Sequence, residues 1–479
     1  MHLVVLDSIG VVGWPAKIRF SASSRITIWL PNPRMSTAIA TLTYRRVRAK
    51  LERHRGSTLL TRTSDLRRGW SRWLPTICCL LAACLISCTT ESVQEAEPGG
   101  AAESTHGSLE TPRVETVDGV TVVHNAGSLW GETPSVSLEP VRVLGCEDGE
   151  LAFYEPADIA IGPAGYLYVL DAGNHRILRI DSQGSVAASF GKRGEGPGEL
   201  QRANGLAIDA AGRMYVSDAV ARSVKVLAPD GEELRTIATG TTAGRLALLS
   251  SGELVVPGIE LFRGPEIDAI ISVYNPDGEL VRGVGELFLY EDWDAYRLFN
   301  QVSTAIGGGD ELFVAYAARN KIEKYDVSGE LVMRFDRPLD YEISQEVEQV
   351  LRQVGPRTIE LPMANHVSVS VALDAAGRIW VLSYDRQLRF DEMALTIAFA
   401  DADGNLEGTE ELKVADRTET DAFSFHVFDR EGRFLGRVPI GHHGGPVEIS
   451  GNSLYILEPR HDMCVYEYRI VDDGTLPQR

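Results

Sequence analysis

The sequence is poor in several residue types and patterns, and each shortage excludes a class of protein. Its 479 residues include only 6 cysteines, far fewer than a fold held together mainly by disulfides contains. The longest apolar run, Leu74–Leu85, has 12 residues, whereas a helix needs about 20 to cross a bilayer. The part of the chain after this run also lacks the HExxH, GxSxG and paired CxxC patterns of zinc and serine enzymes.

Basic residues are scarce over most of the chain. The formal net charge is −20, but residues 1–87 hold 14 Lys or Arg and 3 Asp or Glu, so residues 88–479 hold 33 basic and 64 acidic residues. This excess of negative charge repels nucleic acid and anionic membrane surfaces, so we expect no nucleic-acid partner. Cationic partners and metal ions are compatible with it, and so is a charge that only keeps the domain soluble.

The basic leader has the features of an export signal. Basic residues ending at Arg72 precede the apolar run, and Ser87 and Cys88 follow it. This arrangement resembles the signal peptide of bacterial lipoproteins, in which a small residue precedes the cysteine that is acylated. The resemblance implies a signal peptide at 65–87 and a lipid on Cys88 that anchors the protein in a membrane. It also implies that the protein belongs to the bacterial cell envelope, either periplasmic or associated with the outer membrane. The alternative is a buried apolar helix of the folded domain.

The segments on either side of this signal have no pattern of a folded domain. Residues 88–111 are acidic and contain Gly and Pro without an apolar face, which predicts a flexible tether. Residues 1–64 are longer than the region that precedes the core of a signal peptide. We therefore expect an over-extended or disordered N-terminus, with translation starting nearer Met35 or later.

A repeat of 47 residues indicates the fold. DIAIGPAGYLYVLD (158–171) and GLAIDAAGRMYVSD (205–218) align without gaps, and a further turn glycine follows in each copy, at Gly184 and Gly231. Each copy alternates short apolar runs with Gly- and Asp-containing turns. This pattern predicts four short antiparallel strands per copy.

Four more copies follow, and the last one is incomplete. They begin near residues 246, 303, 369 and 447, and the sixth has only three strands before the chain ends. The missing strand is available upstream of the first copy, in Val141–Leu144. We predict an all-β fold over 112–471, a six-bladed β-propeller of four-stranded antiparallel blades closed by an N-terminal strand, with a tail at 472–479.

The copies resemble NHL repeats, with Asn174-His175-Arg176-Ile177 at the place of the residues that name the motif. The chain from about 112 to 471 is similar to six-bladed, TolB-like propellers that occur as bacterial lipoproteins. The segment TVDGVTVVHNAG, followed by Trp130, resembles the lead-in of those proteins. The resemblance implies the architecture, because its motifs are structural and specify no reaction.

The two cysteines that remain after cleavage and acylation test the predicted closure. Cys464 begins the third strand of the sixth blade, and Cys146 lies just past the end of the borrowed fourth strand. Neighbouring antiparallel strands place the start of one beside the end of the other, which predicts a disulfide between them. The alternative is two separate buried thiols.

The glycine-rich stretch GKRGEGPGEL (191–200) is not a phosphate-binding loop. A P-loop needs Gly-x4-Gly-Lys-Ser/Thr leading into a helix, whereas here Lys192 comes early, Pro197 interrupts the pattern, and a strand follows. The stretch instead lies where the chain crosses from blade one to blade two.

The resemblance also directs attention to the central axis. Peptidyl-hydroxyglycine lyases and lactonase-like propellers hold metal ions on or near this axis, through residues at or beside the innermost strands. In this sequence, residues with oxygen or imidazole ligands recur near the first strand of five blades, where they could hold Ca²⁺ or Zn²⁺. They are Glu155, Asp158, Asn204, Asn300, Asn365, His366, His442 and His443. The alternative is a ring of hydrogen-bonded side chains with no metal or other cofactor.

Two insertions interrupt the repeat. Apolar residues at helical spacing in ISQEVEQVLRQV (343–354), with Ser344 as N-cap, predict one short helix. The segment 291–300 carries Trp293, Tyr296 and Phe299 and is predicted as a loop before blade four. Both insertions either cover a blade junction or form a ligand platform at the channel mouth.

These observations favour a non-enzymatic protein over an enzyme. We expect a scaffold, anchored by lipid, that binds a protein or a small molecule. A metal-assisted lyase or lactone hydrolase at the channel mouth is the second hypothesis, and a structural component of a cell-envelope complex is the third. The sequence specifies neither the ligand nor any catalytic residue.

Overall fold

The computed structural model describes eleven segments of the chain: 3–6, 17–20, 26–29, 111–146, 151–240, 244–258, 269–354, 357–389, 392–400, 406–413 and 419–472. The chain divides into two compact units, residues 1–14 with 108–479, and residues 15–107. The second unit contains a hairpin of β2 (Lys17–Phe20) and β3 (Ile26–Trp29).

The predicted signal peptide, Cys88, most of the tether and nearly all of the tail lie outside the described residues. Within the described part, no helix combines the length and apolar character that crossing a bilayer requires.

Six four-stranded antiparallel sheets form the propeller in the first unit, as the repeat predicts. In each of the first five blades the four strands follow one another in chain order. Blades one to three consist of β7 (Pro156–Ile161), β8 (Leu167–Asp171), β9 (Arg176–Ile180) and β10 (Val186–Phe190); β11 (Ala203–Ile208), β12 (Met214–Asp218), β13 (Ser223–Leu227) and β14 (Glu233–Ala238); and β15 (Ala247–Leu248), β16 (Leu254–Pro257), β17 (Ala269–Tyr274) and β18 (Leu280–Glu286).

Blades four to six have the same layout, except that the last strand of blade six comes from the N-terminal side. They consist of β19 (Val302–Ile306), β20 (Leu312–Tyr316), β21 (Ile322–Tyr325) and β22 (Leu331–Phe335); β25 (Ser368–Leu373), β26 (Ile379–Tyr384), β29 (Phe423–Phe428) and β30 (Phe434–Pro439); and β31 (Val447–Ser450), β32 (Ser453–Glu458), β33 (Cys464–Asp472) and β6 (Val136–Leu144).

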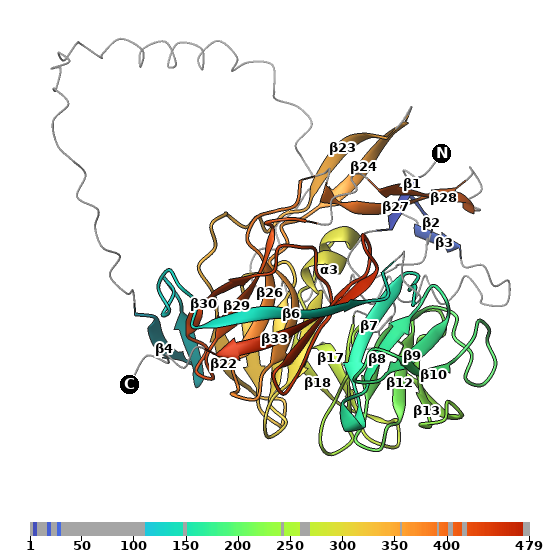
Figure 1. Cartoon of the computed structure of the whole chain (residues 1–479). Coiled ribbons are helices and arrows are strands. Elements are labelled where there is room, and N and C mark those ends of the chain that lie inside the picture. The colour runs from blue at the N-terminus through green and yellow to red at the C-terminus, as the bar shows by residue number, and fades with distance from the viewer. Residues whose placement is uncertain are drawn as a thin grey trace, which may run out of the picture. The chain divides into compact units, whose positions relative to one another are not determined.

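The ring is closed as predicted. The first strands of successive blades pack against one another around the axis, and β31 packs against β7. Strand β6 pairs antiparallel with β33, with Leu144 opposite Val465 and Leu138 opposite Ile470; Figure 1 shows the two strands side by side although they come from opposite ends of the colour scale. The Cys146–Cys464 disulfide is also confirmed, with a sequence separation of 318 between the two cysteines.

The core lies between the blades. Second strands such as β12 are buried at every position, because blades cover both of their faces, whereas the outermost β14 alternates between more and less buried positions. At the junction of blades four and five, the ring of Phe428 packs against Phe335 and Phe434, with ring centroids 5.0 and 5.4 Å away. Apolar contacts of this kind hold neighbouring blades together.

One face of the ring is built from tight turns, several of which share the same pattern of side-chain hydrogen bonds. In five of them the first residue is Asp or Asn, and its side-chain oxygen accepts hydrogen bonds from the backbone N–H groups two and four residues later. Glycine at positive φ, such as Gly184 at 83°, completes each turn. The turns begin at Asp181, Asp209, Asn275, Asp326 and Asp429.

The glycine-rich stretch 191–200 connects β10 to β11, which confirms its assignment as a connection between blades. The Glu199 carboxylate accepts a hydrogen bond from the Gly196 N–H at 2.8 Å. The Lys225 ammonium donates to the carbonyls of Gly196 and Glu199 at 3.0 and 2.7 Å. A lysine of blade two therefore holds the stretch in place.

An N-terminal arm precedes the ring and adds a feature that the sequence did not predict. Strands β4 (Arg113–Val117) and β5 (Val120–His124) form a hairpin, and β5 pairs parallel with β22 at the outer edge of blade four. Blade four thus becomes a six-stranded sheet. The arm then crosses blade five before it becomes β6.

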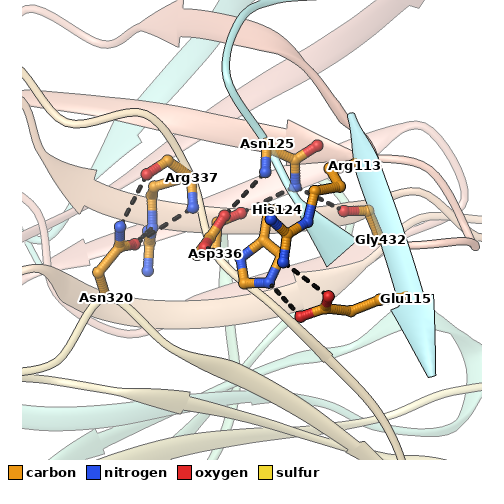
Figure 2. Close-up of polar contacts among 8 residues, drawn as sticks. All are labelled: Arg113, Glu115, His124, Asn125, Asn320, Asp336, Arg337 and Gly432. Atoms are coloured by element: carbon orange, nitrogen blue, oxygen red, sulfur yellow. Dashed lines mark hydrogen bonds and ion pairs between the residues drawn. The ribbon is translucent and has the colours of Figure 1, made fainter. Parts of the chain in front are cut away.

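Polar side chains fix this arm (Figure 2). The two ring nitrogens of His124 lie 3.0 Å from the Asp336 carboxylate and 3.2 Å from the Glu115 carboxylate. Next to it, the Asn125 amide group donates to the carbonyls of Asp336 and Gly432, both at 2.9 Å, and accepts from the Phe434 N–H at 2.8 Å. Asn125 therefore bridges the edges of blades four and five.

Both insertions differ from the prediction. Residues Glu348–Val354 form strand β23, which pairs with β24 (Arg357–Met363), so the predicted helix at 343–354 is wrong. Spacings of four residues place side chains on one face of a strand as well as of a helix, so the apolar pattern did not separate the two. The Ser344 hydroxyl accepts from the Glu346 N–H at 3.1 Å and closes a turn.

The α-helix of the described residues lies instead in the segment predicted as a loop. Helix α3 (Trp293–Phe299) begins after Asp292, whose carboxylate accepts a hydrogen bond from the Ala295 N–H at 2.9 Å. A third insertion, within blade five, forms the hairpin of β27 (Ala394–Ala400) and β28 (Leu406–Lys413), and β1 (Leu3–Leu6) pairs with β27.

Candidate functional site

The two faces of the ring differ in what they carry. The innermost strand of every blade begins at the same face of the ring. Because the strands are antiparallel, the links between blades and the links between second and third strands also lie on this face, which we call the loop face. The tight turns occupy the opposite turn face. Helix α3 and the hairpins β23–β24 and β27–β28 all belong to connections of the loop face. Binding residues are commonly carried by such loops on a rigid scaffold.

Polar side chains on the innermost strands accept backbone hydrogen bonds for which no neighbouring strand is available. The first strand of a blade is a sheet edge, so part of its backbone N–H groups need other acceptors. The carboxylate of Asp158 in β7 accepts from the Leu206 N–H of blade two at 2.9 Å. Ser303 accepts from the Val371 N–H, and Ser370 accepts from the Val447 N–H, both at 3.2 Å. These bonds link one blade to the next around the axis.

One arginine joins four blades at this level. Arg245, which precedes β15 of blade three, places its Nε 3.3 Å from the Asp158 carboxylate of blade one. Its two terminal nitrogens contact the Glu448 carboxylate of blade six and, at 3.0 Å, the Ser370 hydroxyl of blade five. The Arg245 side chain is 14% exposed. We call these four residues the axial cluster.

The axial cluster holds two carboxylates against one guanidinium. The pKa of Asp158 is raised to about 7, chiefly by burial and to a smaller extent by the nearby Glu448, while Arg245 acts in the opposite direction. Burial also raises the pKa of Glu448, again against the effect of Arg245. Glu448 is 30% exposed and Asp158 is 1% exposed, so Asp158 is the deeper of the two carboxylates.

The predicted asparagines act within the fold. Asn204 accepts a hydrogen bond from the Ser217 hydroxyl at 2.8 Å, and Asn365 accepts from the Ser344 N–H at 2.7 Å. Asn300 ends α3, where its amide oxygen accepts from the Phe288 N–H at 2.9 Å and its amide nitrogen donates to the Phe288 and Tyr296 carbonyls, both at 2.8 Å. Their side-chain oxygens are therefore already used. Glu155 is exposed beside β7, at a positive φ of 45°.

The predicted histidines lie in a row of rings that crosses from blade five to blade six. Adjacent ring centroids lie 3.9 to 5.6 Å apart along His366, Tyr384, Phe423, His443 and His461. Burial lowers the pKa of His443 to about 4 and, together with the neighbouring His461, keeps this ring neutral at neutral pH.

His442 lies beside this row and has its own partners. Its ring stacks on Tyr466 at 3.9 Å between centroids, its Nε2 lies 2.8 Å from the Tyr468 hydroxyl, and its Nδ1 lies 2.5 Å from the His443 carbonyl. These contacts account for both ring nitrogens. His442 therefore packs blade six rather than facing the axis with a free nitrogen.

An axial metal ion does not fit this arrangement. The carboxylates of the axial cluster contact Arg245, and the amide oxygens of the three asparagines accept hydrogen bonds from the protein. Across the described segments, no group of three His, Cys, Asp or Glu side chains is placed to hold a metal ion. The predicted residues do lie near the loop face, but the fold brings only Asp158 into the axial cluster.

Helix α3 presents a second feature on the loop face. Leu289 is 68% exposed and Trp293 is 41% exposed, and both flank the exposed acids Glu291 and Asp292. We call these four residues the acidic–aromatic patch. Its support is rigid, because Trp293 packs on Tyr296, with ring centroids 5.5 Å apart, and the helix buries Leu298 and Phe299.

Sequence reasoning missed Arg245 and Glu448. Arg245 lies in TTAGRLALL, where copy three has drifted from the pattern of the first two copies, and no motif marks it. Glu448 lies opposite Tyr455 in blade six, the place that Ala207 holds opposite Tyr215 in blade two. An alignment of the first strands of all six copies is the one signal that could have indicated Glu448.

Comparison with known families agrees with the ring geometry. Residues 153–180 match the family model of the NHL repeat. They contain β7, β8 and β9, the first three strands of blade one, and include the predicted motif residues 174–177. The chain is a six-bladed β-propeller with an NHL repeat in its first blade. None of the curated proteins compared with the sequence matches it.

Several solved structures are similar in fold. A member of the DUF4221 family from Bacteroides vulgatus is 11% identical, with 70% of this chain and 99% of that chain covered and a TM-score of 0.47. Virginiamycin B lyase from Staphylococcus aureus is 10% identical, with 70% and 100% covered and a TM-score of 0.38. A gluconolactonase from Xanthomonas campestris is 13% identical, with 72% and 97% covered and a TM-score of 0.40. At these identities the similarity concerns the fold alone.

Proposed function

We propose that this propeller is a non-enzymatic binding scaffold, anchored by lipid in the bacterial cell envelope, that captures its partner on the loop face. The observation that carries the proposal is the acidic–aromatic patch, where Trp293 is exposed on a capped helix of that face and Leu289 is exposed just before it. Large apolar side chains exposed together on a rigid element are typical of interaction sites.

The chemistry of the patch indicates the class of partner. Glu291 and Asp292 add negative charge beside the indole of Trp293, and the chain from residue 88 onward is strongly acidic. Lys and Arg side chains are attracted both by carboxylates and by the face of an indole ring. We therefore expect a partner that presents basic and apolar groups together, such as a basic, leucine-containing peptide segment.

The axial cluster supports binding over metal-assisted catalysis. Its carboxylates are already paired with Arg245, and the three predicted asparagines and His442 hold backbone or side-chain groups of the protein. A metal-assisted lyase or lactone hydrolase would need these residues to exchange their present partners. A binding scaffold needs no such change.

Binding can be tested on the full-length protein in detergent with two synthetic peptides of equal length, one alternating Lys and Leu and the other Glu and Leu. The Lys–Leu peptide should bind more tightly. Trp293→Ala should weaken its binding by about 5-fold or more, the factor that corresponds to roughly 1 kcal/mol. Leu280→Ala, which removes a side chain of similar exposure from a blade-three strand, should leave binding unchanged. Equal binding of both peptides, or no effect of Trp293→Ala, would contradict the proposal.

The anchor is tested separately by growing cells that express the full chain with radiolabelled palmitate. The protein should incorporate label and fractionate with membranes, and Cys88→Ser should abolish both properties. Cys146→Ser together with Cys464→Ser is the matched control, because it removes thiols without removing the acylation site. Label that persists in Cys88→Ser would show that the assignment of the anchor is wrong.

A further inference from the structure

The axis of the ring is occupied by a charged group that belongs to the chain itself. We infer that the guanidinium of Arg245 is the resident cation of this propeller, held by oxygen ligands from three other blades in the position where a metal ion would otherwise bind. Its role is to tie blades one, three, five and six together at the centre. The inference concerns the axial cluster and is independent of the function proposed for the patch.

The geometry of the ligands supports this role. Asp158 is fixed before it meets Arg245, because its carboxylate accepts the N–H groups of Ile159 and Leu206, both at 2.9 Å. Ser370 is likewise fixed by the Val447 N–H at 3.2 Å. Arg245 therefore meets preorganised oxygens, and its planar fork reaches several acceptors at once, which a lysine ammonium cannot do in the same way.

The charges of the cluster support it as well. Two carboxylates face one guanidinium, so removing Arg245 would leave two buried or half-buried acids without a counter-charge. Such a pair is strongly destabilising unless a proton or another cation replaces the lost charge. Carboxylate and hydroxyl oxygens are the ligands that Ca²⁺ prefers, so a chain without Arg245 should acquire a dependence on Ca²⁺ that the natural chain does not have.

The test compares thermal unfolding of the full-length natural chain and of Arg245→Ala, each with EDTA, with Ca²⁺ and with dilute guanidinium chloride. The melting temperature of the natural chain should be the same in all three. Arg245→Ala should melt lower in EDTA, and either cation should raise its melting temperature by about 2–4 °C when present at roughly ten times its dissociation constant. Titration calorimetry should show one Ca²⁺ bound to Arg245→Ala and none to the natural chain.

Arg282→Ala is the matched control. Arg282 contacts a single carboxylate, Glu253, at 2.7 Å, away from the axis. Its loss should lower the melting temperature without any recovery by Ca²⁺ or guanidinium. This control separates a specific axial site from a general response of the protein to cations.

Two results would overturn the inference. One is stoichiometric Ca²⁺ or Zn²⁺ binding to the natural chain that Asp158→Asn abolishes, because a metal would then be the resident cation. The other is an Arg245→Ala protein as stable as the natural chain in EDTA. If Arg245→Ala fails to fold, Arg245→Lys replaces it: a lower melting temperature than the natural chain supports the inference, and an unchanged one rejects it.

Discussion

His124 couples the charge of one side chain to the docking of the N-terminal arm. Both of its ring nitrogens face carboxylates, Asp336 at 3.0 Å and Glu115 at 3.2 Å, so only the doubly protonated ring donates to both. The hydrogen bonds to Asp336 and then to Glu115 raise the pKa of His124 above its usual value. The ring is 43% exposed, so solvent screens a large part of these attractions.

This arrangement predicts a pH dependence of arm docking. Because the pKa of His124 is higher in the folded protein, its stabilising contribution is complete below its unfolded pKa of about 6.5 and is lost as the pH rises through the folded pKa. An NMR titration of histidine side chains should therefore give His124 a pKa above about 6.5. Glu115→Gln should lower that pKa.

The matched control is Glu132→Gln, which removes an exposed carboxylate of the arm that does not contact His124. It should leave the titration of His124 unchanged. A pKa of His124 at or below the value of a free histidine, in the natural chain, would show that the two carboxylates do not hold its proton.

The types of the candidate residues could be predicted from the sequence, but their partners could not. Asp158, Asn204 and Asn300 lie near the starts of innermost strands, as expected from their place in the repeat. What they bind depends on side chains far away in the sequence: Asp158 meets Arg245 and, through it, Glu448. A repeat shows which positions of the copies are equivalent. At the axis, however, residues from different positions of different copies meet, and the repeat does not predict these contacts.

At the scale of elements, the repeated strands were predictable because sequence and burial follow the same period. Strands such as β8 and β12 recur at a spacing of 47 residues and are bounded by Asp and Gly turns. The insertions have no second copy to compare with. There the apolar residues Val350 and Val354 fit a helix and a strand equally well, and β23 formed because β24 supplied a partner.

Helix α3 shows the opposite error at the same scale. Its signals were present, with Asp292 as N-cap followed by Ala295, Leu298 and Phe299 on one buried face. The aromatic residues suggested a loop that carries function, and the short length of seven residues gave little periodicity to detect. Helices this short form only when tertiary packing supports them.

The β4–β5 hairpin could not have been placed from the sequence. Its strand β5 pairs with β22, which lies about 210 residues later and runs parallel to it, and no local pattern indicates so distant a partner. The pairing extends the free edge of blade four, and the outer strand β4 becomes the new edge. The charged pair Arg113 and Glu115 on β4 is a feature that discourages further strand addition.

At the scale of the whole molecule, one covalent bond closes the ring. The Cys146–Cys464 disulfide joins the borrowed strand to the last blade across 318 residues. Cross-links over such long segments restrict the unfolded chain strongly. In the chain-entropy account this one contributes about 5–6 kcal/mol to the free energy of unfolding.

Replacing both cysteines with serine should therefore lower the melting temperature by several degrees while leaving the ring assembled. The measurement is thermal unfolding followed by circular dichroism, with the natural chain in reductant as a second sample that should behave like the double variant. A double variant as stable as the oxidised natural chain would mean that the bond adds nothing to closure.

Because strand β6 comes from the N-terminal side, the ring can close only late in the synthesis of the chain. During synthesis β6 emerges more than 300 residues before β33, the strand that it pairs with. Strand β6 therefore cannot pair with its partner until the third strand of blade six has been made. The ring closes only from that point, and a chain cut short before Cys464 would expose unpaired strand edges, which favour aggregation.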